Sequence, residues 1–194
     1  MSVRMAVKED LPQILEIYAP YVLETAVSFE YTVPTLEEFT ARFQNITKQF
    51  PWLVWEEKGR IWGYAYASAP FTRAAYQWCA AASIYLHPKV QGKGIGKRLY
   101  QVLEAILTLQ GYRKLYAVVT TANEASVAFH QAVGYTNLVT FSDCGVKFGG
   151  LYGTVWLEKD LNTVGIPSLP PVCVGEIVRN DENLTRIFDK MPLS

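Results

Sequence analysis

A glycine-rich stretch near the middle of the chain, residues 91–97, most constrains what the protein can fold into. It reads Q-G-K-G-I-G-K and follows an apolar run, residues 80–86, that is typical of a buried strand. After it, apolar residues recur at helical spacing as far as Gln110, which predicts an amphipathic helix. Glycines let the backbone approach an anion closely, and free N–H groups at a helix N-terminus attract negative charge. The sequence therefore predicts a strand, a phosphate-binding turn and a helix in succession.

Two other phosphate-binding motifs do not fit this stretch. A Walker loop needs a longer glycine spacing and a Ser or Thr after Gly-Lys, and a dinucleotide fingerprint needs G-x-G-x-x-G early in a βαβ unit. Here Gly92, Gly94 and Gly96 alternate, and Gln91 precedes them. The run resembles the acetyl-CoA pyrophosphate loop, Q/R-x-x-G-x-G/A, of the Gcn5-related N-acetyltransferases (GNAT), with Gln91, Gly94 and Gly96 at the motif positions.

Composition excludes several other classes of protein. The chain has 194 residues, half of them hydrophobic, which suits one well-filled domain. Its 18 basic and 18 acidic residues cancel, so no basic surplus favours nucleic acid, and no run reaches transmembrane length. The N-terminus lacks a signal-peptide pattern. Cys79, Cys144 and Cys173 are odd in number and lack metal-ligand spacing, so we expect free thiols, no metal site and a cytoplasmic protein.

Hydrophobic periodicity and turn signals predict the order of elements. The expected strands are residues 3–7, 52–56, 61–69, 80–86, 115–119, 138–144 and 152–159. The expected helices run from a cap at Asp10, from a Thr35–Glu38 capping box, from the glycine loop to Gln110, and over residues 123–133, with Ala125, Ala128, Phe129, Ala132 and Val133 inward. This order matches the GNAT fold, an α/β (α+β) fold whose mixed, twisted sheet carries helices on both faces.

The resemblance to the GNAT family covers residues 1–161 as one acetyltransferase domain. Residues 162–194 are first rich in proline and then polar. We expect this segment to be a C-terminal tail docked on the domain or on a dimer partner.

Within the family, the chain most resembles the phosphinothricin and methionine-sulfone acetyltransferases. The matching positions, in chain order, are Ile17, Tyr18, Tyr21 and Val22; S-F-E ending at Glu30; A-P-F at 69–71 with Arg73 and Tyr76; S-I-Y-L-H-P at 83–88; Asn123, Ser126 and His130; Gly134 and Tyr135; and K-F-G at 147–149. Two positions depart from the subgroup. Ala81 and Gly153 stand where the subgroup usually has Glu and Asp near the amine substrate, so the substrate does not transfer directly.

The resemblance implies which residues bind acetyl-CoA. The glycine loop would hold the pyrophosphate, and the main chain before its turn would pair with the pantetheine arm like an added strand, although Ile84 and Leu86 are also at core positions. An N–H near Ile84 or Tyr85 would polarise the thioester carbonyl. Asn123 and Ser126 form one helical stripe that faces the arm in relatives. The expected cofactor-binding residues are Ile84, Tyr85, Leu86, Gln91, Gly92, Lys93, Gly94, Ile95, Gly96, Lys97, Asn123 and Ser126.

His130 is the expected general acid. It continues the stripe of Asn123 and Ser126, at a position where many family members have a Tyr that protonates the thiolate, and an imidazole titrates near neutrality. The alternative for His130 is a solvated helix histidine. Tyr135 either reaches the thiolate instead or packs as a core aromatic. Glu30 either takes the amine proton through water or is a surface charge, and His87 is interpreted as structural.

The expected substrate-binding residues are Phe29, Glu30, Phe71, Thr72, Arg73 and Ala81. A guanidinium at Arg73 would pair with an α-carboxylate through two hydrogen bonds, as the loop that grips substrate in the subgroup implies. As a surface arginine it would need no such role.

The sequence thus predicts an enzyme that transfers acetyl from acetyl-CoA to the amino group of a small molecule, an amino acid or analogue, by direct attack. A catalytically weak acyl-CoA-binding regulatory module is the alternative, favoured by Ala81 and Gly153, and a protein or peptide amine is a third. The resemblance also implies a homodimer that pairs through its sheet edge, where Phe141, Phe148, Tyr152 and Trp156 lie. The apolar segment 166–174 would add to that interface.

Overall fold

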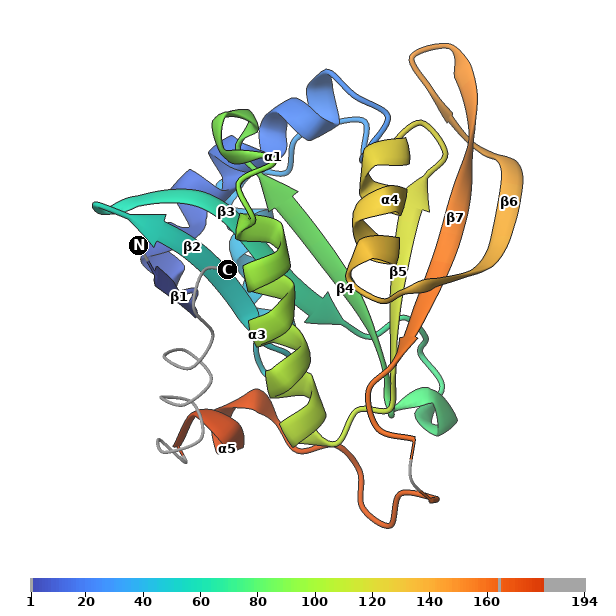
Figure 1. The fold of residues 1–194 in the computed structure, drawn as a ribbon. Helices are drawn as coiled ribbons and strands as arrows, with labels where there is room; N and C mark the ends of the chain where they lie inside the picture. Colours follow the sequence, from blue (N-terminus) through green and yellow to red (C-terminus); the bar gives the residue numbers. More distant parts are fainter. Residues whose placement is uncertain (1, 164, 180–194) are drawn as a thin grey trace.

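One mixed sheet forms the framework of the protein. The computed structural model describes residues 2–163 and 165–179, and within them seven strands lie in the order β1-β2-β3-β4-β5-β7-β6 (Figure 1). Neighbouring strands are antiparallel except β4 and β5, which are parallel. The strands are β1 (Ser2–Met5), β2 (Trp52–Glu57), β3 (Arg60–Ser68), β4 (Cys79–Leu86), β5 (Lys114–Thr120), β6 (Thr136–Lys147) and β7 (Gly150–Asp160).

Helices cover both faces of this sheet, which confirms the predicted fold class. The α-helices are α1 (Leu11–Leu23), α2 (Leu36–Ile46), α3 (Ile95–Gln110), α4 (Glu124–Ala132) and α5 (Val174–Arg179), and short 3-10 turns lie at Lys8–Asp10, Ala74–Tyr76 and Pro88–Val90. Helices α1 and α2 pack with one set of strand residues, and α3 packs with the alternate set. This division follows from the two-residue period of a strand.

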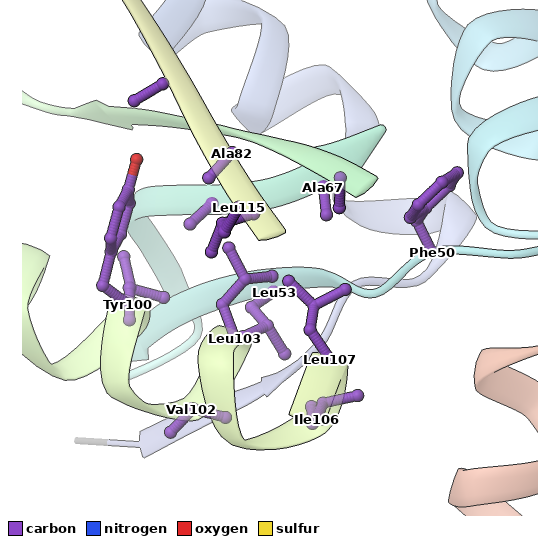
Figure 2. Packing of buried hydrophobic residues seen from close by; sticks show 14 of the residues in the cluster. Phe50, Leu53, Ala67, Ala82, Tyr100, Val102, Leu103, Ile106, Leu107 and Leu115 are labelled. Carbon is purple, nitrogen blue, oxygen red and sulfur yellow. The ribbon is translucent and has the colours of Figure 1, made fainter. Parts of the chain in front are cut away.

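The core beneath α3 is continuous from β2 to β5. In Figure 2, Leu103 and Leu107 of α3 lie beside Leu53 of β2, with Ala67 of β3 and Leu115 of β5 close by. Small residues on the strands let the large residues of α3 approach, so this face is densely filled. On the other face, Trp52, Val54 and Tyr64 pack against α1 and α2.

Local signals in the sequence act as expected at two places. The Thr35 side chain accepts from the Glu38 N–H while the Glu38 carboxylate accepts from the Thr35 N–H, so the predicted capping box starts α2. Lys58 and Gly59, with φ of 52° and 77°, make the tight turn between β2 and β3, as predicted.

Strands β4 and β5 pair over a short length only. Their register joins Cys79 to Lys114, Ala80 to Leu115 and Ala81 to Tyr116, and no later pair follows. Figure 1 shows the two strands together at their N-terminal ends and separating toward their C-terminal ends. The two strands therefore diverge beyond Ala81 and Tyr116.

The orientation of α4 differs from the prediction. The expected inward residues Ala125, Ala128 and Ala132 are exposed, whereas His130 is only 2% exposed. The helix contacts β5 and β6 where the sheet opens, so its polar stripe faces inward toward a cavity instead of its small apolar residues. The other two expected inward residues, Phe129 and Val133, do pack against the core beneath α3, so the prediction is wrong for the three alanines.

Asp10 also acts differently from the expected helix cap. Its carboxylate accepts two hydrogen bonds from Arg4, at 2.7 and 2.8 Å, and one from the Val7 N–H, and its side chain makes no cap bond to α1. The carboxylate therefore ties β1 to the start of α1, because a buried charge needs a partner.

The segment after β7 packs beside α3 for part of its length. The side chains of Gln49 and Gln110 donate to the Val172 carbonyl, and Val174 is buried. Of the expected tail, residue 164 and residues 180–194 lie outside the described residues. No helix in the described part of the chain is long and apolar enough to cross a membrane.

Candidate active site

The glycine loop lies between β4 and α3. It leaves the N-terminus of α3 without a side-chain cap. Gly92 and Gly94 have φ of 74° and 77°, a left-handed conformation that favours glycine. Gly94 is the N-cap of α3 and has no side chain to bond the N–H groups of the first turn. These groups are free to bind an anion, and the helix dipole adds attraction.

A cleft of ≈ 520 Å³ lies beside this loop, and we call it the loop cleft. Its walls are the glycine loop, the end of β4 and one side of α4, with Ile84, Leu86, Gln91, Gly92, Gly94, Gly96, Lys97, Asn123, Ser126 and Phe129 among the lining residues. A Cβ at Gly96 would lie 3.3 Å from the Phe129 ring and 3.4 Å from Ile84 Cδ1, so only a very small residue lets α3 approach α4 here. Of the other expected cofactor-binding residues, Lys93 is exposed and Ile95 points into the core.

Tyr21 of α1 closes the cleft near the turn. Its hydroxyl donates to the Leu86 carbonyl and accepts from the Gln91 side-chain amide, at 2.5 and 3.1 Å. Gln91 is thus held by a residue that the sequence matched only as part of the resemblance. Burial raises the pKa of the Tyr21 phenol, so it stays protonated and keeps this bond.

A smaller cavity of ≈ 60 Å³ opens from the loop cleft between β4 and β5, and we call it the sheet cavity. The two spaces share Val27, Ile84, Asn123 and Ser126. The other lining residues are Ala82, Ser83, Tyr85, Tyr100, Ala117, Val118, Val119, Thr120 and His130.

The sheet cavity reaches both faces of the sheet. Ala82 and Ala117 belong to the core beneath α3, whereas Tyr85, three positions after Ala82 on β4, packs with the aromatic residues of the α1 face. Val27 comes from the loop between α1 and α2. The space therefore passes through the gap left by the missing strand pairs, and a group on either face can meet one on the other.

His130 lies in the wall of the sheet cavity next to Tyr100. Its Nδ1 is 2.7 Å from the Ser126 carbonyl oxygen, and its Nε2 is 2.8 Å from the Tyr100 hydroxyl. A carbonyl only accepts, so Nδ1 carries the proton and the Tyr100 hydroxyl donates to Nε2 when the ring is neutral. Burial lowers the pKa of His130, although the bond to Ser126 opposes this shift. The solvated histidine considered as an alternative is therefore wrong, and His130 and Tyr100 line the cavity as a hydrogen-bonded pair.

Tyr135 lies outside both spaces. Its ring packs at 5.2 Å between centroids against His130, and its hydroxyl is buried without a partner among the described residues. Burial holds the pKa of this phenol well above its usual range. The structure therefore matches the packed aromatic, and it does not bring Tyr135 to the cavity as an alternative acid.

Glu30 and Phe29 follow Val27 in the loop before α2. The Glu30 carboxylate forms an ion pair with Arg42 at 2.7 Å and is about one-third exposed. The Phe29 ring packs directly on Gly145, at a spot that any side chain on residue 145 would occupy. Lys147, itself buried, donates to the carbonyls of Val22 and Ser28 and so fixes the start of this loop.

The remaining expected substrate residues form a separate group beside the closed end of the strand gap. Phe71, Thr72 and Arg73 are exposed, and the Phe71 ring stacks on Trp156 at 6.2 Å. Ala81 pairs with Tyr116, whose ring also contacts Phe71. None of these residues lines the loop cleft or the sheet cavity.

The surroundings of Gly153 in β7 leave no room for a side chain at this position. A Cβ there would lie 2.5 Å from the Phe141 carbonyl oxygen and 3.0 Å from Thr121 Cγ2. The backbone of β6 has closed over this position, so an Asp would require the hairpin to move.

Several residues at this site were missed from sequence. Tyr100 and Thr120 line the sheet cavity, and Tyr21 and Val27 line the loop cleft. Tyr100 lay outside the apolar positions used to predict α3, and Thr120 ends a strand without any motif. Their only signal was a polar atom on an otherwise buried segment.

The comparisons with known proteins agree with this geometry. A family model described as "Acetyltransferase (GNAT) domain" matches residues 3–156. The chain belongs to the GNAT acetyltransferase family. Its strand order, glycine loop and divided sheet are thus those of an acetyltransferase.

Individual relatives support a subgroup of this family. This acetyltransferase is 35% identical over 171 residues to a phosphinothricin N-acetyltransferase of Alcaligenes faecalis, covering 87% of this chain and 86% of that protein. It is 30% identical over 168 residues to an L-methionine sulfoximine/L-methionine sulfone acetyltransferase of Salmonella typhimurium, covering 86% and 98%. A crystal structure of a phosphinothricin acetyltransferase from Sinorhizobium meliloti in complex with AcCoA aligns with a TM-score of 0.83 and 37% identity over 86% of this chain and 92% of that one. The predicted resemblance is confirmed.

Because His130 is buried, we expect the free energy of unfolding of this acetyltransferase to depend on pH. Its pKa is lowered in the folded state, so the unfolded chain binds more protons as the pH falls through the ordinary histidine value of about 6.5. We expect the free energy of unfolding, measured with urea, to decrease between pH 7.5 and 5.5. His130→Gln should flatten this dependence, and His87→Gln, at a more exposed histidine, should keep most of it. Equal slopes in wild type and His130→Gln would contradict the assignment.

Proposed function

We propose that this chain transfers the acetyl group of acetyl-CoA to the amino group of a small, amino-acid-like molecule by direct attack. The observation that carries the proposal is the opening between β4 and β5, which connects the loop cleft to the opposite face of the sheet. Two substrates that enter from opposite faces can meet there without a covalent enzyme intermediate. The relatives named above, whose amine substrates are phosphinothricin and methionine sulfoximine or sulfone, support this class.

The loop cleft fits acetyl-CoA, which supplies an activated thioester and a thiol leaving group when bound. The free N–H groups after Gly94 and the ammonium of Lys97 suit the pyrophosphate. Beyond Ala81, the edge of β4 toward β5 has no strand partner, so Ile84 to Leu86 can pair with the amides of the pantetheine arm. Asn123 and Ser126 stand where the arm would enter the sheet cavity.

Tyr100 and His130 are suited to carry one proton between the reacting groups. Neutral His130 can accept the Tyr100 proton at Nε2 while the Tyr100 oxygen takes a proton from the attacking nitrogen. Reversal of both transfers restores the pair and delivers that proton to the leaving sulfur, so the protons balance. The lowered pKa of His130 keeps the ring neutral and ready to accept.

The acceptor side has positive and aromatic groups but few acids. Arg73 offers a guanidinium for a carboxylate, and Phe71 and Phe29 offer apolar contact. Glu30 remains the candidate to take the first proton of the ammonium through water, with Arg42 holding its carboxylate. Because Ala81 and Gly153 supply no carboxylate, we propose an acceptor recognised by its own carboxylate and an apolar side chain.

A thiol-release assay with matched amines tests the function. The panel contains L-methionine sulfone, phosphinothricin, L-phenylalanine, L-leucine and phenethylamine, which is phenylalanine without its carboxylate. We expect acetyl-CoA-dependent thiol release with at least one amino acid of the panel and much less with phenethylamine. Tight binding of acetyl-CoA by calorimetry with no release for any amine would instead support the regulatory acyl-CoA-binding module.

The proton-carrying pair is tested by removing each partner. With the best amine of the panel, His130→Ala should lower kcat by about tenfold to ten-thousand-fold, the range of general acid–base catalysis, with little change in acetyl-CoA affinity. Tyr100→Phe should lower kcat similarly, because it removes the hydroxyl that is hydrogen-bonded to the imidazole. A wild-type kcat in either variant would remove that residue from the mechanism.

We further propose a cytoplasmic homodimer. The three cysteines are free among the described residues, as suits a reducing compartment. Edge strand β6 and its turn expose a series of apolar side chains, Leu138, Val139, Phe141, Val146, Phe148 and Leu151. A second copy would cover such an edge.

Light scattering at micromolar concentration tests the dimer. We expect twice the mass of the chain, and the mass of one chain after Phe141→Lys together with Phe148→Lys. Leu109→Lys, at an exposed leucine of α3, is the matched control and should stay dimeric. Leu169→Lys probes the apolar segment after β7, because Leu169 is exposed. A wild-type protein with the mass of one chain would contradict the proposal.

A further inference from the structure

Thr120, the last residue of β5, has a buried hydroxyl without a partner. The residue is 6% exposed, and its Oγ1 has no hydrogen bond to any described residue. A buried hydroxyl that has lost its water partners costs free energy unless it is bonded again. Thr120 lines the sheet cavity, so the missing partner belongs in that space.

Thr120 lies on one face of the sheet, and this face determines whether its side chain points toward acetyl-CoA or toward the amine in the proposed function. Leu115, Ala117 and Val119 of β5 pack in the core beneath α3, so the alternate residues project toward the α1 face. Tyr116 confirms this alternation, because its ring contacts Phe71 outside that core. The hydroxyl of Thr120 therefore lies on the sheet face opposite α3 and α4, two helices that line the loop cleft. We call this face the acceptor face.

Other hydroxyls of the sheet cavity already have partners. Tyr100 bonds to His130, and the Ser126 hydroxyl lies 3.4 Å from His130 Nδ1. The Ser83 hydroxyl bonds to Tyr66. The cavity lining contains no carboxylate. Tyr85, which lies on the same face as Thr120, bonds to Tyr18. Among the hydroxyls that line the cavity, Thr120 is thus the one that still has both its proton and its lone pairs to offer.

We propose that the Thr120 hydroxyl positions the attacking amine. Its oxygen accepts one N–H of the neutral amine, which directs the nitrogen lone pair across the sheet cavity toward the loop cleft. Its own proton is then free to bond a carboxylate oxygen on the same amino acid, a pairing that suits an α-amino acid better than a simple amine. This role rests on the proposed function, and it gives the acceptor face a neutral contact in place of the carboxylates missing at Ala81 and Gly153.

Thr120→Val tests the proposal, because valine keeps the branched shape and removes the hydroxyl. With the best amine of the panel, kcat/KM for the amine should fall about tenfold or more, as expected when a substrate hydrogen bond is lost. KM for acetyl-CoA should stay within about twofold, because the loop cleft is unchanged. Thr120→Ser keeps the hydroxyl and should retain most of the activity.

Two controls separate this role from a structural one. Thr154→Val makes the same change directly across the ladder on β7, where the hydroxyl contacts Cys144 Sγ, and it should leave kcat/KM unchanged. The melting temperature of Thr120→Val should equal or exceed that of wild type, because an unbonded buried hydroxyl is removed.

The outcomes are distinct. Wild-type kcat/KM in Thr120→Val would overturn the proposal and indicate that the hydroxyl binds only water. A loss in Thr120→Ser equal to that in Thr120→Val would also overturn it, because side-chain volume would then be the cause. If wild type itself releases no thiol with any amine, the proposed function fails and this role fails with it. Activity in wild type with a loss confined to the valine variant supports both.

Discussion

The interruption of the ladder between β4 and β5 is the constraint on which the site depends. A sheet normally pairs its backbone groups along the whole strand, and an unpaired buried N–H or C=O costs free energy. Here pairing stops at Ala81 and Tyr116, so the next residues of β4 have no strand partner on that side. Helix α1 packs against β4 from one face, and on the other face the Ile84 side chain of β4 lies beside Gly96 of α3. An extended ligand amide is the natural replacement for the missing strand.

Much of the framework could be predicted because it depends on local signals. The capping box at Thr35, the turn at Lys58 and Gly59, and the glycine run at Gln91 each specify the backbone within a few residues. The resemblance to known acetyltransferases was also local, since its motifs lie on the loops and strand ends around the gap. These features require no knowledge of which elements become neighbours.

The site was less predictable because it depends on neighbours that are distant in sequence. Thr120 and Tyr100 belong to no motif. They become candidate site residues only because β4 and β5 diverge and both side chains then line the same cavity. The burial of the three alanines of α4 was predicted wrongly for the same reason. Periodicity assigns the apolar side of a helix to the core, whereas here a polar cavity beside the sheet takes the side that holds Ser126 and His130. The exposed loop with Arg73 also stays apart from the cavity within one chain.

The loop before α2 is attached to the end of β6 by several contacts. Lys147 donates to the Ser28 carbonyl, Tyr31 donates to the Val146 carbonyl, and the Phe29 ring rests on Gly145. These contacts join the loop before α2 to the hairpin of β6 and β7. The buried ammonium of Lys147 is one of the groups that connect them. A displacement of the outer strand β6 would therefore be transmitted through these side-chain contacts to the loop that carries Val27, without passing through the glycine loop. Because Val27 lines both the loop cleft and the sheet cavity, a sequence change at this outer edge can alter the shape of both spaces at once.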